Sequence, residues 1–142
     1  MDIYTKTILR FASNIPYAER LDRPDVSITK RTAVCGSSMT VDLNIENGKI
    51  QRIGLDVKAC ALGQASASIF AKNAVGLTLN EVQKLKIELI EFLKTGNFQI
   101  KPPFEDYKYL SPARSVPYRH DSILLVLDST EEGLNESING LQ

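Results

Sequence analysis

The sequence predicts an α+β fold in which a three-stranded antiparallel sheet, a meander, carries helices packed on one of its faces. Two alternating apolar and polar segments flank Asn47-Gly48, and Asn-Gly between such segments is the strongest short signal for a hairpin. The residues after the hairpin, over 60–95, have the spacing and capping signals of two helices. Because so small a sheet is not stable alone, we expect these helices to cover one of its faces.

The composition is that of an ordinary globular domain. With 142 residues, 43% of them apolar and 24% charged, the chain is expected to form one domain over 1–142. The 17 basic residues balance 17 acidic ones without a basic stripe or a long apolar run, which argues against nucleic-acid and membrane partners. The first residues do not look like a signal peptide, so a cytoplasmic location with reduced thiols is expected. In an exported protein, a disulfide between Cys35 and Cys60 is the alternative.

The N-terminal part predicts a helix followed by the sheet. The helix is expected over 1–14, because apolar residues recur there at helical spacing, and Asn14-Ile15-Pro16 ends it. A linker with two prolines follows over 15–25. The sheet is expected over 25–57, with a first strand from Asp25 to Cys35. Its second strand alternates apolar residues with polar ones such as Asp42, which predicts one polar face.

Two helices are predicted over 60–95. The first runs from Cys60 to Val75, is rich in alanine, and is expected to end at Gly76 as its C′ glycine. The second begins at the capping box Thr78-Leu79-Asn80-Glu81 and ends at Gly96. Its predicted buried face consists of Val82, Leu85, Leu89 and Phe92.

The C-terminal part has weaker signals. Residues 97–118 contain four prolines and no clear period, which predicts a loop, and loops of that length are often functional. The apolar run from Ile123 to Leu127 is compatible with a strand or a buried helix by its period alone. The last residues are mainly polar from Glu131 on, and a frayed tail is expected over 134–142.

The only two cysteines of the chain lie at the ends of predicted elements. Cys35 precedes Gly36, where the backbone can approach a ligand closely. Cys60 opens a helix, whose free N–H groups favour a thiolate. Thiolates in such places bind metals or sulfur species, so Cys35 and Cys60 are the candidate site residues.

The order of these motifs resembles a known family. The motifs are Cys35-Gly36, the hairpin, Cys60-Ala61 with Gln64-Ala65-Ser66-Ala67-Ser68, and Arg119-x-x-Ser122, preceded by Asn14-Ile15-Pro16 and Leu21-Asp22-Arg23-Pro24-Asp25. Over about 3–130 they resemble the iron–sulfur cluster assembly scaffolds, the NifU N-terminal domain and its relatives IscU and SufU. The resemblance implies a NifU/IscU-like fold with a C-terminal helix over 120–133.

The chain departs from this family at two positions. Ser37 stands where the family has an aspartate, and Ser122 stands where it has a third cysteine. If the match is shifted by one residue, His120-Asp121-Ser122 resembles the family's His-Cys-Ser, and Asp121 replaces the cysteine instead. The family's Leu-Pro-Pro-Val-Lys segment, which its chaperone recognises, is also absent, and Ser115-Val116-Pro117-Tyr118-Arg119 occupies that region.

The resemblance implies two arrangements of ligands. In one, Cys35, Cys60 and His120 hold a zinc or iron ion, and Asp121 or water completes the tetrahedral set. In the other, a homodimer supplies four cysteines to a transient [2Fe–2S] cluster. A lone histidine is also commonly a surface or helix-capping residue, which is the alternative for His120.

The resemblance implies a scaffold-like protein of iron–sulfur cluster assembly rather than an enzyme that turns over. Cys35 and Cys60 would accept sulfur from a cysteine desulfurase, combine it with iron, and pass a cluster to acceptor proteins. One alternative is a degenerate relative that acts as a binding or regulatory module for the desulfurase. Another is a zinc-dependent sulfur-transfer protein with relay activity.

Overall fold

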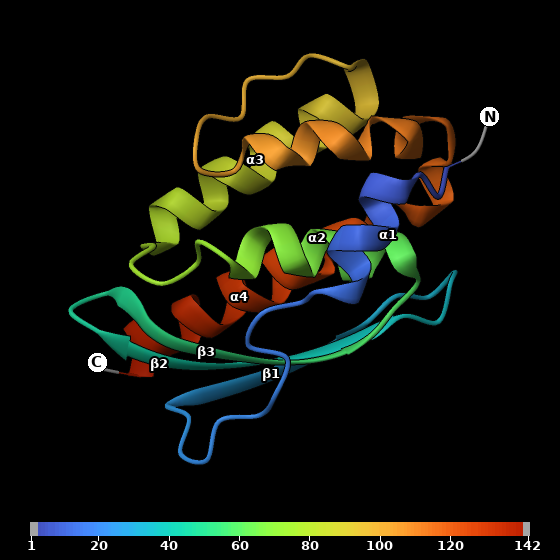
Figure 1. The fold of residues 1–142 in the computed structure, drawn as a ribbon. Helices are drawn as coiled ribbons and strands as arrows, with labels where there is room; N and C mark the ends of the chain where they lie inside the picture. The colour runs from blue at the N-terminus through green and yellow to red at the C-terminus, as the bar shows by residue number, and fades with distance from the viewer. Residues whose placement is uncertain (1–2, 141–142) are drawn as a thin grey trace.

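The computed structural model describes residues 3–140 and has the predicted α+β architecture (Figure 1). Its elements are α1 (Lys6–Ser13), β1 (Val26–Arg31), β2 (Ser38–Glu46), β3 (Lys49–Lys58), α2 (Ala61–Ala71), α3 (Leu79–Thr95), the 3-10 helices η1 (Glu105–Ser115) and η2 (Pro117–Arg119), and α4 (His120–Gly140). The strands form one antiparallel sheet of order β1-β2-β3. Helices α2 and α4 contact the sheet, α1 packs on α2, and α3 packs on α4. The fold class is therefore confirmed.

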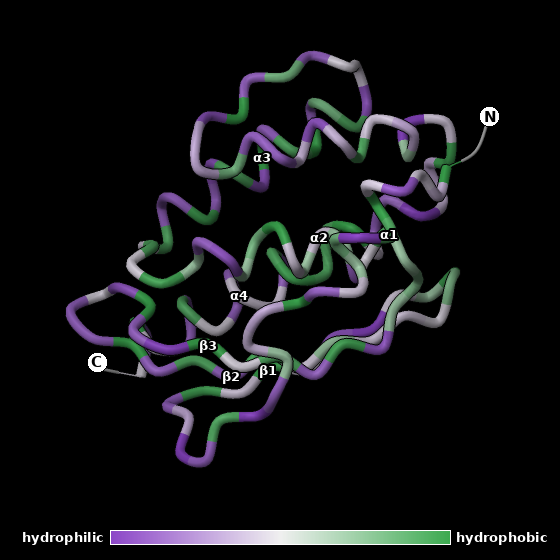
Figure 2. The backbone as a smooth tube through the Cα atoms, in the orientation of Figure 1, coloured by the Kyte–Doolittle hydropathy of each residue, from purple (hydrophilic) through white to green (hydrophobic). Residues whose placement is uncertain are grey.

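The hairpin between β2 and β3 forms where the sequence predicted it. Asn47 and Gly48 both have positive φ, 55° and 75°, as a tight turn between two twisted strands requires. Hydrophobic and hydrophilic residues alternate along both strands (Figure 2). The apolar set faces the helices, and Val41, Leu43 and Leu55 are completely buried there.

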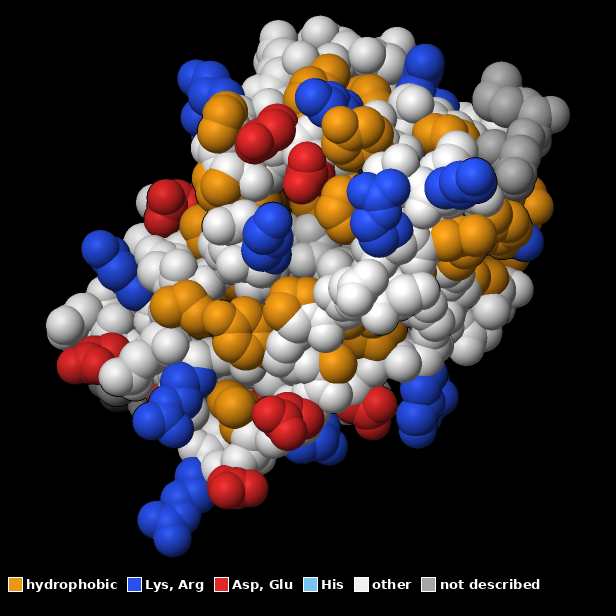
Figure 3. Space-filling model, viewed as in Figure 1, with side chains coloured by type: hydrophobic (Ala, Val, Ile, Leu, Met, Phe, Trp, Pro, Cys, Tyr) orange, Lys and Arg blue, Asp and Glu red, His pale blue; other side chains and the backbone are white. Residues whose placement is uncertain are grey.

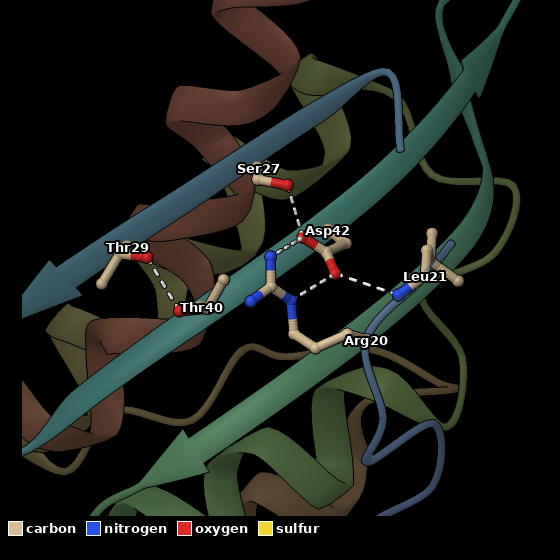
Figure 4. Close-up of polar contacts among 6 residues, drawn as sticks. All are labelled: Arg20, Leu21, Ser27, Thr29, Thr40 and Asp42. Carbon is tan, nitrogen blue, oxygen red and sulfur yellow. Dashed lines mark hydrogen bonds and ion pairs between the residues drawn. The ribbon is translucent and has the colours of Figure 1, made fainter. Parts of the chain in front are cut away.

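The opposite face of the sheet is less open than the alternation predicted, because Asp42 on it is completely buried. Residues before β1 fold over this carboxylate (Figure 4). Arg20 donates from Nε at 2.7 Å and from Nη2 at 3.1 Å, and the Leu21 N–H donates at 3.0 Å. Ser27 adds a hydrogen bond from its hydroxyl. Burial alone would raise the pKa of Asp42, but these hydrogen bonds outweigh it and lower the pKa, so the ionised carboxylate ties the linker to the sheet.

Several element ends differ from the prediction. Helix α1 begins at Lys6 after its N-cap Thr5, so residues 3–5 are not helical, and residues 1–2 of the predicted helix lie outside the described residues. β1 ends at Arg31 instead of Cys35, because a turn closed by the Thr32 N–H and the Ser37 carbonyl follows it. Helix α2 ends at Ala71. Gly76 is not its C′ glycine but donates its N–H to the Ile50 carbonyl in a later turn.

Helix α3 has the predicted ends and buried face. Thr78 and Glu81 form the capping box, and Gly96 closes the helix in the left-handed conformation with φ 84°. The predicted apolar residues are all buried, together with Leu93. Local capping signals were therefore sufficient to place this helix.

The predicted loop and tail are both more ordered than expected. Most of 97–118 is helical, because η1 and η2 occupy it, and η1 buries Tyr107, Leu110 and Ala113. Helix α4 continues through 134–140, where Leu134 is buried, so the predicted tail is helical up to Gly140. Residues 141–142 lie outside the described residues.

The face of the molecule shown in Figure 3 is mixed in charge. Lys and Arg side chains are scattered there among Asp and Glu side chains, and no large area carries a single sign. Across residues 3–140, none of the helices combines the length and the apolar character needed to cross a bilayer.

Candidate functional site

The fold brings Cys35 and Cys60 to the same end of the sheet. Cys35 lies in the turn before β2, and Cys60 lies in the connection from β3 to α2. Because Ser38 at the start of β2 pairs with Lys58 at the end of β3, the two connections are neighbours. Both cysteines are free and partly exposed.

Two serines connect the thiols through a continuous chain of polar contacts. Cys35 Sγ lies 3.5 Å from Ser37 Oγ, and Ser37 Oγ lies 3.0 Å from Ser122 Oγ. Ser122 Oγ lies in turn 3.5 Å from Cys60 Sγ. Ser37 is 2% exposed and Ser122 is completely buried. We call Cys35, Ser37, Ser122 and Cys60 the two-thiol site, in which the cysteines are partly exposed and the serines form a buried floor.

A close approach of α4 to α2 places Ser122 in this floor. Gly63 of α2 leaves the room, because a Cβ there would lie 2.5 Å from Ser122 Oγ and 2.8 Å from Ala59 Cβ. Ser66, also on α2, donates its hydroxyl to the Ile123 carbonyl at 2.6 Å. The hydroxyl of buried Tyr107 donates to the Ser66 carbonyl at 3.1 Å and lies 3.0 Å from Ser66 Oγ. A buried network therefore holds the first turn of α4 against α2.

The turn that carries Cys35 is arranged around its sulfur. Thr32 Oγ1 accepts the Ser37 N–H at 3.0 Å and lies 3.3 Å from Cys35 Sγ. The hydrogen bond to Ser37 and then the one to Thr32 lower the pKa of the Cys35 thiol below its ordinary value, against an opposing effect of burial. Since the thiolate is the nucleophilic form, these contacts favour the reactive form of Cys35.

Replacing Ser37 with alanine is therefore expected to raise the pKa of Cys35 and to slow its reactions near neutral pH. We would measure the rate of alkylation by iodoacetamide against pH in a Cys60→Ala background, where Cys35 is the only thiol. The midpoint should move to higher pH in Ser37→Ala and, by less, in Thr32→Ala. Exposed Ser111 offers a control, and Ser111→Ala should leave the midpoint unchanged. Equal midpoints in all variants would contradict the assigned hydrogen bonds.

The structure does not bring His120 into the two-thiol site. Its Nε2–H donates to the Ala113 carbonyl at 2.8 Å. Together with Asp121 it lines a hollow of about 440 Å³ between α3 and α4. Within residues 3–140, no three side chains of His, Cys, Asp or Glu are grouped to hold a metal ion. The predicted set of Cys35, Cys60 and His120 is therefore not assembled.

The geometry also decides which residue occupies the third position of the site. Ser122 faces Cys60, whereas Asp121 is exposed and lines the hollow on the other side. Arg119, considered above as part of the C-terminal motif, stacks its guanidinium 5.5 Å from the ring centres of both Tyr4 and Tyr118.

Three residues that support the site were not predicted from the sequence. Thr32, which contacts Cys35, lies in a segment predicted as a strand. Ser66 and Tyr107, which hold α4 against α2, lie in a predicted packing helix and a predicted loop. The small residues of α2, among them Gly63, were a usable signal, because small residues allow two helices to approach closely. The partner helix was not identifiable from that pattern.

Comparisons with known proteins agree with this fold. Residues 3–100 match the family described as NifU-like N terminal domain. The iron–sulfur cluster assembly scaffold protein IscU of Thermotoga maritima is 24% identical over 134 residues, 94% of each chain. A nitrogen-fixing NifU-like protein (N-terminal) from Brucella abortus is 36% identical, with TM-score 0.91 over 96% of this chain and 95% of that one.

A more distant structure shares the fold alone. It is named as an iron–sulfur cluster assembly scaffold protein for the SUF system of Fervidobacterium islandicum AW-1, and it superposes with TM-score 0.83 at 17% identity, over 93% of this chain and 96% of that one. The match over residues 3–100 and the Brucella relative carry the assignment. The chain belongs to the NifU-like N-terminal domain family.

Proposed function

We propose that this chain is a scaffold-like protein of iron–sulfur cluster assembly that accepts sulfur and iron at Cys35 and Cys60 and passes on a cluster. The observation that supports this proposal best is that two partly exposed cysteines each contact one of two adjacent buried serine hydroxyls. The Thermotoga maritima relative, which matches 94% of this chain, is named as an iron–sulfur cluster assembly scaffold protein. A cysteine desulfurase is the proposed sulfur donor, and cluster-acceptor proteins are the proposed recipients.

The sulfur step is a transfer between thiols. The Cys35 thiolate attacks the outer sulfur of the donor's persulfide, a new S–S bond forms on Cys35, and the donor's S–S bond breaks. The donor cysteine leaves as a thiolate, so this transfer needs no oxidant or reductant. Release of the bound sulfur as the sulfide of a cluster takes two electrons per sulfur, and we propose that a protein electron donor supplies them. The Ser37 and Thr32 contacts support this role, because they favour the thiolate of Cys35.

Iron and the assembled cluster are the cargo of this site. A [2Fe–2S] cluster held by protein thiolates takes four of them, and one chain has two. We therefore propose that two copies of the chain face each other through their two-thiol sites when a cluster is held. His120 and Asp121 are left out of this ligand set, since they lie on the hollow between α3 and α4.

The test is anaerobic reconstitution with ferrous iron and sulfide, followed by metal and sulfide analysis. Cys60→Ala should abolish cluster retention, because two facing copies would then supply only half of the thiolates. Ser111→Ala, at an exposed serine of η1, is the matched control and should retain the wild-type content. A Cys60→Ala variant that holds as much iron and sulfide as wild type would refute the proposal.

A sulfur-relay protein is the second candidate, favoured by the contacts that prepare Cys35 for attack. Mixing the chain with a cysteine desulfurase separates the candidates. Persulfide transfer without iron retention favours the relay. Binding without transfer favours a regulatory module.

A further inference from the structure

We propose that Ser37 and Ser122 set the cargo of a single chain: their paired hydroxyls let the two-thiol site carry sulfur but prevent one chain from closing around a metal ion. This inference rests on the proposed function, because it concerns the same thiols. It concerns two residues that stand between the thiols and whose hydroxyls touch both of them.

The geometry places the serines where further metal ligands would be needed. The polar atoms of four side chains follow one another from Cys35 Sγ through Ser37 Oγ and Ser122 Oγ to Cys60 Sγ. Neighbouring atoms in this row are 3.5, 3.0 and 3.5 Å apart. Zinc and iron in proteins take thiolates, imidazoles and carboxylates, and structural sites close with four such ligands. One chain offers two thiols and two neutral hydroxyls here, so its residues do not fit a tetrahedral metal ion.

The hydroxyl pair can also form hydrogen bonds with a sulfur species, whereas a metal ion accepts no hydrogen bonds. A hydroxyl donates one hydrogen bond and accepts others. Ser37 and Ser122 are both buried, so they find these partners in each other and in the two sulfurs. When Ser37 donates to the Cys35 thiolate, Ser122 can donate to Ser37 Oγ and accept from the Cys60 thiol, so a sulfur bound to Cys35 would remain beside the Ser37 donor. A metal ion bound by both thiolates would draw the two sulfurs away from the serine hydroxyls. The two buried hydroxyls would then lose their hydrogen bonds to sulfur.

The structure therefore suggests a change of cargo by substitution. Ser122→Cys places a third thiol on the first turn of α4, and Ser37→Asp places a carboxylate beside Cys35. Each position faces a thiol from the buried side, so the double variant Ser37→Asp/Ser122→Cys should assemble three thiolates and one carboxylate in a single chain. Gly63 keeps the space that the larger sulfur at position 122 requires, because it has no Cβ of its own.

The experiment measures zinc alone, by competition with a chromogenic chelator under reducing conditions. The double variant should bind one zinc per chain, at least about 100-fold more tightly than wild type, since it provides a full ligand set. Ser111→Cys, which adds a thiol on the exposed side of η1, is the matched control and should behave like wild type. Wild type that binds one zinc per chain as tightly as the double variant would overturn the inference.

A second readout follows the sulfur side. After treatment with inorganic polysulfide, mass spectrometry should find an added sulfur on Cys35 in wild type, and less of it in Ser37→Ala/Ser122→Ala. Equal retention in both would also overturn the inference. If the double variant loses the cooperative unfolding of wild type, Ser122→Cys alone decides by the same zinc titration.

The zinc experiment and the reconstitution experiment with Cys60→Ala can fail independently of each other. If Cys60→Ala retains iron and sulfide, the scaffold role fails, but the zinc comparison still tests what the serines exclude. If the zinc comparison fails, Cys60→Ala still tests the scaffold.

Discussion

Replacing Tyr107 with alanine is expected to lower the free energy of unfolding by about 3–5 kcal/mol, as loss of a large buried aromatic ring typically does. Tyr107 is completely buried, and its hydroxyl contacts both the carbonyl and the hydroxyl of Ser66. The substitution therefore creates a cavity and removes a buried donor. Denaturant unfolding followed by circular dichroism measures the difference.

Two further variants separate the parts of this effect. Tyr107→Phe keeps the ring and removes only the hydroxyl, so about 0.5–1.5 kcal/mol should be lost with its hydrogen bond, because the Ser66 carbonyl keeps its helical partner within α2. Tyr118 is 54% exposed, and Tyr118→Ala should cost less than about 1 kcal/mol. If Tyr107→Ala were no more destabilising than Tyr118→Ala, η1 would not contribute to the core as described.

Gly63→Ala is expected to disturb the two-thiol site and to cost about 1–3 kcal/mol by overpacking. The new methyl would lie 2.5 Å from Ser122 Oγ and 3.1 Å from the Ser122 carbonyl oxygen, so the first turn of α4 must move away from α2. That movement should break the contact between Ser122 and Cys60. The readouts are denaturant unfolding and the alkylation rate of Cys60 in a Cys35→Ala background.

The matched control for this substitution is another helical glycine. Gly140 of α4 faces open space, and alanine is the better helix former, so Gly140→Ala should leave stability unchanged or slightly higher. An unchanged Cys60 alkylation rate and unfolding curve in Gly63→Ala would show that α2 and α4 do not need this close approach.

The parts of the fold that follow from neighbouring residues were predictable. Asn47-Gly48 specifies its turn because both residues accept positive φ, and the Thr78 capping box begins α3 through its own side chains. The alternation along β2 identified the apolar face, because side chains of a strand point to opposite sides in turn. These signals operate within a few residues, so no partner element was needed to interpret them.

The errors lie where a distant segment supplies the partner. Asp42 looked like a solvent-facing residue, but Arg20 and Leu21 cover it from the linker before β1. Residues 97–118 have no clear period because η1 packs its buried residues, including Tyr107, against several elements. For the same reason the C-terminal end of α4 was predicted as a tail, although Leu134 is buried.

The candidate site divides in the same way. Two cysteines at the ends of elements identified the thiols, and the family resemblance identified the positions that depart from it, all from residue order. Whether Asp121 or Ser122 faces Cys60, and whether His120 joins the thiols, depends on the rotation of α4 about its axis. That rotation is determined by packing against α2 at Gly63 and Ser66, a contact between segments about 57 residues apart, as in the bond from Ser66 to Ile123. Residue order identifies the chemical groups of this protein, whereas long-range packing selects which of them meet.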